Sequence, residues 1–187
     1  RDPVRAAKKH PDRTWVRLDV DEVDSIVQAL QGVDGVIYLV HGLASGPGYE
    51  ERERTAARAF AEQSDLAGVK RIVYLGGVEP VGVPSVHLQS RLATGRILRA
   101  GPVPTIELRA GMIIGHGSES WQICRDLAVR LPLMLLPTWL DTPSEPVAVD
   151  DVVAACVHAI GSGIESGAYD IPGPEQLSAK DILLRVA

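Results

Sequence analysis

The sequence predicts an α/β fold: a doubly wound parallel sheet with a small substrate-side subdomain at its C-terminal end. Short apolar runs such as Gly35–Val40 and Val69–Leu75 are typical of strands that a parallel sheet buries on both faces. Segments with helical spacing of apolar residues alternate with these runs, and the connections span only a few residues. This alternation predicts right-handed crossovers with helices on both faces of the sheet.

The first half of the chain supplies two predicted strands and two predicted helices. Thr14–Val20 reads as a short strand, and Asp21 is a plausible N-cap for a helix that stops at Gly32. Gly35–Val40 is predicted to be a fully buried strand. A charged helix over Tyr49–Leu66 follows, and its predicted inner face comprises Ala56, Ala59, Phe60 and Gln63.

The alternation continues through Val69–Leu75 (strand), Ser85–Ala100 (helix, capped by Ser85) and Thr105–Ile114 (strand). Residues 1–117 are therefore assigned to the sheet core and 118–187 to a substrate-side or lid portion of the same domain. That portion is predicted to contain a helix near 118–130, an extended piece leading into a helix over 146–160, a strand over 168–173 and a last helix. The last helix begins at a capping box, Ser178–Asp181. The Pro- and Leu-rich segment Leu131–Pro146 fits a substrate-side wall or an ordinary core-and-loop segment.

The composition argues against several classes of function. Hydrophobic residues make up 45% and charged residues 23%, as in an ordinary globular protein. A net charge of −5 with only 4% aromatic residues argues against nucleic acid. No apolar run reaches the roughly 18 residues of a membrane span, and no signal peptide is visible, so a cytoplasmic location is expected. The two cysteines form no CxxC, and the five histidines show no metal-ligand spacing, so no metal site is predicted.

The stretch Arg71–Arg91 is the predicted centre of the chemistry. A strand, the pair Gly76-Gly77 and a loop lead into a helix that carries His87 and Arg91. These two side chains lie at i, i+4, on one helix face. In open α/β sheets, ligands bind where strands end in this way.

The chain resembles an atypical member of the extended short-chain dehydrogenase/reductase superfamily, close to the NmrA-like NAD(P)H-binding domains. The matching pieces, in order, are RDP at the N-terminus, LDV at 18–20, GVDGVIYLVHG, AGVKRIVYLGGV, LRAGMIIGHG and PVAVDDVVAA. The resemblance implies a Rossmann-like fold whose first βαβ portion, including the glycine-rich phosphate turn, is absent from the chain. GPGYEE at 46–51 does not replace that turn, because its last position holds Glu51 instead of glycine.

The resemblance also implies roles for particular residues. It places adenine at Asp19 and Val20, ribose and diphosphate at Val40, His41 and Gly42, nicotinamide at Ala110, Gly111 and Met112, and a 2′-phosphate at Arg1. An Arg1 guanidinium there favours NADP, with NAD still possible. Ordinary structural roles remain open for several of these residues: a helix cap for Asp19, a turn for Gly42 and a solvated end for Arg1.

The departures from the superfamily fall on the catalytic set, a Ser followed by Tyr-x-x-x-Lys. Gly76-Gly77 stands where the Ser is expected, and His87 and Arg91 stand at the Tyr and Lys positions. Arg91 can bind ribose hydroxyls but cannot exchange a proton. His87 can act as acid or base near neutral pH, line the cofactor site without proton transfer, or be a solvated helix residue. Ser118 and Ser120 are alternative polar contacts for a substrate, or simply helix N-caps.

The resemblance implies an NAD(P)(H)-binding protein, an atypical oxidoreductase or epimerase-like enzyme with a small carbonyl or hydroxyl substrate. The alternative is a non-catalytic NADP(H)-sensing module that acts through a partner, and a third reading is a structural domain without ligand. A homodimer or a protein partner stays open.

Overall fold

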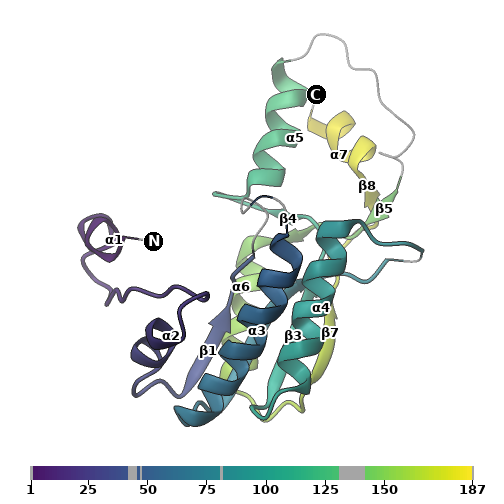
Figure 1. The fold of residues 1–187 in the computed structure, drawn as a ribbon. Helices are drawn as coiled ribbons and strands as arrows, with labels where there is room; N and C mark the ends of the chain where they lie inside the picture. Colours follow the sequence, from purple (N-terminus) through teal and green to yellow (C-terminus); the bar gives the residue numbers. More distant parts are fainter. Residues whose placement is uncertain (1, 42–45, 47, 81, 131–141, 187) are drawn as a thin grey trace.

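The computed structural model describes residues 2–41, 46, 48–80, 82–130 and 142–186, and its centre is a parallel four-stranded sheet (Figure 1). The strands are β1 (Gly35–Tyr38), β2 (Arg71–Gly77), β3 (Thr105–Ala110) and β7 (Gly167–Ile171), in the order β1-β2-β3-β7. All three pairings are parallel. The predicted α/β fold with a parallel central sheet is therefore confirmed.

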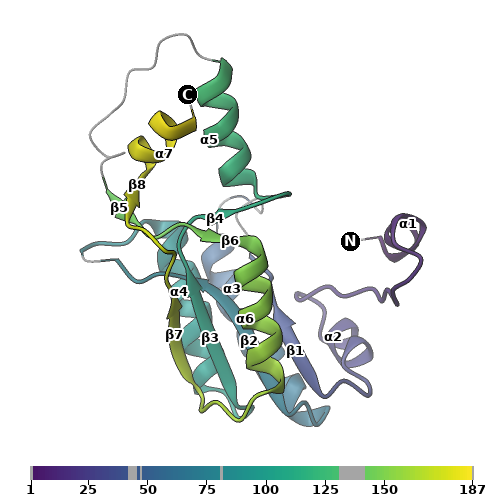
Figure 2. The same ribbon diagram turned by 180° about the vertical axis from the view of Figure 1, so that it is seen from behind.

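Helices cover both faces of this sheet. Figure 1 shows α3 (Tyr49–Leu66) and α4 (Val86–Ala100) in front of the strands, and the reverse view in Figure 2 shows α6 (Val149–Gly161) on the opposite face. The short helix α2 (Val23–Ala29) lies beside β1 and packs on α3. Helix α1 (Pro3–Lys9) buries none of its residues.

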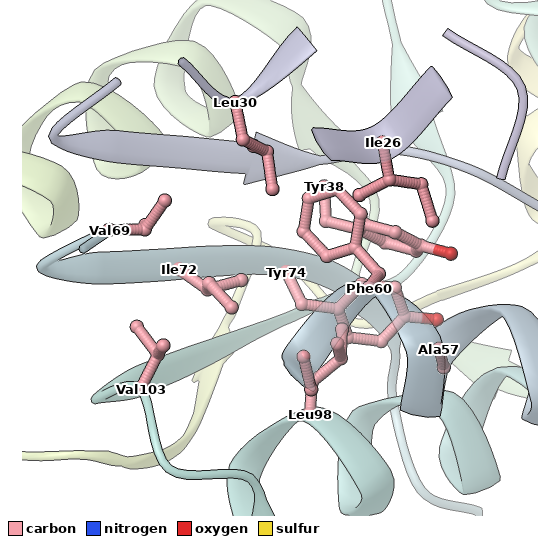
Figure 3. Close-up of a cluster of buried hydrophobic side chains, with 11 residues drawn as sticks. Ile26, Leu30, Tyr38, Ala57, Phe60, Val69, Ile72, Tyr74, Leu98 and Val103 are labelled. Carbon is pink, nitrogen blue, oxygen red and sulfur yellow. The ribbon is translucent and has the colours of Figure 1, made fainter. Parts of the chain in front are cut away.

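Two apolar clusters hold the layers together. On the α3/α4 face, Tyr38 and Phe60 meet edge-on with ring centroids 4.8 Å apart, and Tyr74 packs beside them (Figure 3). On the other face, α6 contributes Val152 and Cys156, which pack against Val73 and other strand residues. Strand β2 thus places alternate side chains in opposite clusters, with Ile72 and Tyr74 in one and Val73 in the other.

Several predicted elements match closely. Helix α3 spans Tyr49–Leu66 as predicted, and Ser85 caps α4 by accepting a hydrogen bond from the Leu88 amide at 3.3 Å. The inner face of α3 is rotated from the predicted one, because the buried residues are Ala56, Ala57, Phe60, Ala61 and Ser64. Ala59 and Gln63 are only partly buried.

Three predictions about the region before α3 are wrong. Thr14–Val20 forms no strand, because no described strand lies beside it to complete a hydrogen-bonded ladder. The run Gly35–Val40 is not buried on both faces: β1 ends at Tyr38 and is an edge strand, so Ile37, Leu39 and Val40 are exposed. The N-cap of α2 is Glu22 rather than Asp21.

The predicted strand Thr105–Ile114 is divided in the structure. After β3, the chain turns at Gly111 and pairs again as β4 (Ile113–Ile114), parallel to β6 (Val147–Ala148). A Cβ on Gly111 would lie 2.9 Å from the Glu145 carbonyl oxygen, so glycine permits this close approach of two backbones.

The remaining elements lie beyond the carboxyl ends of the strands (Figure 1). They are α5 (Glu119–Arg130), β5 (Pro143–Ser144), β8 (Leu177–Ser178) and α7 (Ala179–Val186). Ser178 and Asp181 form the predicted capping box, with reciprocal hydrogen bonds of 2.8 and 3.0 Å between amide and side chain. Most of the predicted wall Leu131–Pro146 lies outside the described residues. No helix within the described ranges is long and apolar enough to cross a membrane.

Candidate functional site

The carboxyl ends of β1, β2 and β3 lie at one edge of the sheet. Tyr38 is paired with Tyr74, and Gly77 is paired with Ala110, so the segments that leave these strands start side by side. Parallel strands direct their last residues to the same edge, which is where α/β proteins bind ligands. The predicted cofactor residues after all three strands are therefore brought to one edge.

The N-terminal half of α4 is fixed against this edge by three hydrogen bonds. The Arg91 guanidinium donates to the Leu75 carbonyl oxygen at 3.0 Å, and the Tyr74 hydroxyl donates to the Arg91 carbonyl oxygen at 3.1 Å. Burial raises the pKa of Tyr74 to about 12, so this hydroxyl stays a donor. Ser90, which is buried, donates from its hydroxyl to the Glu53 carboxylate of α3.

These bonds place His87 one turn before Arg91, at the edge of the sheet. Its Nδ1 atom is buried and has no hydrogen-bond partner in the part of the chain that the structure describes. The ring of His41, which follows β1, lies edge-on to it with centroids 6.3 Å apart. Burial, then the Arg91 charge and His41, lower the pKa of His87 from 6.5, and Glu53 opposes the shift.

A small, partly open pocket of about 90 Å³ lies between the end of β1, residues 20–21 and the first half of α3. Its lining combines aromatic, apolar and charged side chains: Val20, Asp21, Tyr38, Val40, His41, Tyr49, Arg52, Glu53 and Ala56. Three predicted cofactor residues, Val20, Val40 and His41, therefore share one pocket. Polar groups among apolar ones are typical of small-molecule sites, but ligand pockets usually enclose about 300 Å³ or more, so this pocket holds at most part of a nucleotide.

Other predicted residues have structural partners. The Asp19 carboxylate accepts a hydrogen bond from the Asp21 amide at 3.2 Å, and the Asp19 amide donates to Ser25 at 2.8 Å. These bonds form a local turn ahead of α2, so Asp19 has a structural role but is not the helix cap considered for it, because the N-cap of α2 is Glu22. The Met112 carbonyl accepts from the Val147 amide at 2.9 Å. Arg1 and Gly42 lie outside the described residues.

The two glycines that end β2 are closely packed. A Cβ on Gly76 would lie 3.0 Å from Glu107 Oε1, and one on Gly77 would lie 2.8 Å from Leu88 Cδ1. A serine at either position therefore requires a neighbouring side chain to move. Ser118 accepts from the Trp121 amide at 3.3 Å, which is the N-cap role considered for it, and Ser120 is exposed at the start of α5.

Sequence reasoning missed a buried carboxylate on β3. The Glu107 side chain has no exposed surface and accepts hydrogen bonds from Arg99 Nε at 2.8 Å and Arg109 Nε at 3.3 Å. Arg109 also pairs with Glu79 at 3.2 Å, and Glu79 pairs with Arg96 at 3.0 Å. This ion-pair chain runs from the sheet interior to the segment that follows β2. Glu107 could have been singled out as a charge in an otherwise apolar strand, but no sequence signal links it to its partners.

Glu53 was also missed. It lies within a run of charged residues at the start of α3, where nothing in the sequence distinguishes it from its exposed neighbours. In the structure it lines the pocket and accepts from Ser90.

The chain's own residues fit part of a nicotinamide dinucleotide. The Nδ1 atom of His87 is buried without a hydrogen-bond partner among the described residues and could bond to a polar group of a ligand. The Arg91 guanidinium has further N–H donors beyond the one that bonds to Leu75. The pocket supplies aromatic and apolar surface next to charged groups. In the described ranges, no glycine-rich turn joins a strand to a helix ahead of β1, so the fit concerns the nucleoside rather than the diphosphate.

Comparison with known proteins agrees with this geometry. A family model described as NAD(P)H-binding matches residues 1–98, just over half of the 187 residues. A Streptomyces griseus protein, (4-alkanoyl-5-oxo-2,5-dihydrofuran-3-yl)methyl phosphate reductase, is 28% identical over 190 residues, which cover 96% of this chain and 62% of that protein.

Solved structures share the fold at low identity. DesIV, a dTDP-glucose 4,6-dehydratase from Streptomyces venezuelae with NAD bound, has a TM-score of 0.78 at 16% identity, covering 98% of this chain and 65% of that one. The Citrobacter sp. triphenylmethane reductase complexed with NADP(H) has a TM-score of 0.74 at 19% identity, covering 95% and 60%.

This chain thus spans less than two thirds of the length of these relatives. The family match and the shared fold confirm the predicted resemblance to extended short-chain dehydrogenases/reductases. The chain belongs to the NAD(P)H-binding family.

Proposed function

We propose that this protein is an NAD(P)H-dependent reductase that acts on a small compound with a polarised carbonyl group. The carrying observation is the His87–Arg91 pair: a fixed guanidinium and a buried, unbonded imidazole nitrogen face the edge where three parallel strands end. The Streptomyces griseus relative is named as a reductase of an oxo-dihydrofuran phosphate, which supports a carbonyl-containing substrate.

Each residue has a distinct task in this proposal. A bound reduced nicotinamide supplies the hydride. Arg91 binds ribose hydroxyls with donors left over from its bond to Leu75 and holds the ring against the substrate, because positioning provides much of the rate of hydride transfer. His87, in its protonated form, delivers the proton that the substrate oxygen takes when its carbon accepts the hydride. Val20, Val40 and His41 line the nucleoside pocket.

The finer choice of cofactor rests on the sequence. The resemblance implies that the Arg1 guanidinium pairs with a 2′-phosphate, so we propose NADP(H) in preference to NAD(H). The test is direct titration of the full-length protein with NADPH and with NADH under identical conditions. Tighter binding of NADH contradicts the preference.

A non-catalytic NADP(H)-sensing module is the second candidate. Gly76-Gly77 favours it, because the strand end offers no hydroxyl to polarise a substrate carbonyl. A sensor requires affinity for the cofactor but no proton donor.

One pair of variants distinguishes the two functions. NADPH binding and NADPH oxidation with a panel of carbonyl compounds are measured for wild type, His87→Phe and Arg91→Ala. For a reductase, His87→Phe abolishes turnover and leaves NADPH binding intact, whereas Arg91→Ala weakens binding. If no compound is reduced and only Arg91→Ala lowers affinity, the protein is a sensor.

A further inference from the structure

His41 and His87 form a pair of imidazoles contributed by two different elements. His41 follows β1, is exposed and lines the open pocket, whereas His87 on α4 is partly buried. Their rings meet edge-on at an interplanar angle of 79°. His41 is thus the solvent-accessible member of the pair.

The pair is too far apart for a direct hydrogen bond. The centroids are 6.3 Å apart, and each ring nitrogen lies little more than an ångström from its ring centre. A single water between the two rings is a suitable bridge, since bridging waters are nearly as favourable as direct bonds.

Charged groups from three elements surround His87. Arg91, on its own helix, and His41, after β1, disfavour a second positive charge there. Glu53, on α3, favours it, and its carboxylate is held in place by the buried Ser90 hydroxyl. A positive charge on His41 therefore opposes a positive charge on His87.

We propose that His41 is a proton-relay residue that recharges His87 from solvent, and that Glu53 is the positioning residue whose fixed carboxylate favours the protonated form of His87. The catalytic part of this inference rests on the proposed reductase function. The proton coupling between the two rings does not, because it follows from their separation and surroundings in the protein alone.

The proton balance is simple. When the substrate carbon accepts a hydride from NAD(P)H, the substrate oxygen takes the proton of the His87 imidazolium, which gives an alcohol, oxidised cofactor and neutral His87. The bridging water then donates a proton to His87 and receives one from protonated His41. His41 takes a proton from solvent, so one solvent proton is consumed in each turnover.

The first test needs neither cofactor nor substrate. Imidazole titrations are followed by NMR in the full-length wild type, His41→Gln, Glu53→Gln and the control His158→Gln, whose imidazole is exposed on α6. We expect the His87 titration to move to higher pH in His41→Gln and to lower pH in Glu53→Gln, with no change in the control. An unchanged His87 titration in His41→Gln overturns the coupling.

The second test measures single-turnover NADPH oxidation with the best carbonyl substrate. For His41→Gln we expect about a tenfold loss of the single-turnover rate at neutral pH and saturating NADPH, with partial rescue by added imidazole. A full rate in His41→Gln overturns the relay, as does a loss explained entirely by weaker NADPH binding. If no carbonyl compound is reduced by wild type, the reductase proposal fails together with the relay, while the NMR result still decides the coupling.

Discussion

Replacing Gly95 with alanine tests the packing beneath the candidate site. Gly95 lies inside α4, where alanine is ordinarily more stable than glycine by about 1 kcal/mol. Here an added Cβ would lie 2.4 Å from Glu107 Oε1 and 2.5 Å from Glu107 Cδ. The carboxylate has no free space to retreat, because it is fully buried and bound by Arg99 and Arg109. We therefore expect Gly95→Ala to destabilise the fold.

The magnitude follows from two opposing contributions. Displacing Glu107 strains the packing and weakens a charged hydrogen bond. We take the total cost as about 3 kcal/mol, which is the upper end of the usual range for either effect alone. The gain in helix propensity offsets about 1 kcal/mol of this cost. The expected net loss is about 2 kcal/mol in the free energy of unfolding, measured by urea denaturation with circular dichroism.

Two further variants make the test specific. Gly161→Ala, at the end of α6, places its Cβ in open space and is expected to change stability by no more than about 0.5 kcal/mol. In a Glu107→Ala background, Gly95→Ala is expected to become neutral or stabilising, because the clashing carboxylate is gone. A Gly95→Ala protein as stable as wild type, or a cost that persists in that background, would refute the reasoning.

Four other outcomes are expected. Burial, the Arg91 charge and His41 lower the pKa of His87, so NADPH oxidation is expected to accelerate as the pH falls through that lowered pKa. His87→Phe is expected to abolish this acceleration in the pH profile. Phe60→Ala, in the larger cluster, is expected to cost about 3–5 kcal/mol in urea unfolding, with a correspondingly lower melting temperature. Gly111→Ala is expected to cost about 1–3 kcal/mol through contact with the Glu145 backbone and to weaken NADPH binding in titrations. Hydrogen bonds from Ser178 lower the pKa of Asp181. The stability that the ionised Asp181 contributes is therefore present near neutral pH and is lost as the pH falls through the lowered pKa. Asp181→Asn is expected to speed hydrogen exchange in α7 at neutral pH but not in strong acid.

The sequence was sufficient to predict the layered fold because apolar periodicity reports directly on burial. Tyr49–Leu66 and the Ser85 cap are local features, and the structure reproduces both. The secondary structure of Thr14–Val20 could not be predicted from its own residues in the same way. Whether an extended segment becomes a strand depends on a neighbour at its edge, which its own residues do not specify.

The candidate site shows the same limit. The i, i+4 spacing of His87 and Arg91 identified the helix face, and the structure places both at the strand ends. The proximity of His41 to His87, and of Glu53 to Ser90, depends on how α3, α4 and β1 pack together. Gly76 and Gly95 are far apart in sequence, yet both leave space for Glu107. Such relations require the three-dimensional structure.

The ion-pair chain from Glu107 to Arg96 passes from a dry interior to open solvent. Its inner pair buries Glu107 fully, whereas at its outer end the side chains of Glu79 and Arg96 are 48% and 61% exposed. Dissolved ions screen exposed charges over a Debye length of about 8 Å at physiological ionic strength but screen buried ones far less. Ionic strength therefore acts on one end of the chain only. High salt is expected to weaken the ion pair between Glu79 and Arg96 while the pairs of Glu107 persist, so that the segment that follows β2 responds to salt and the buried strand β3 does not.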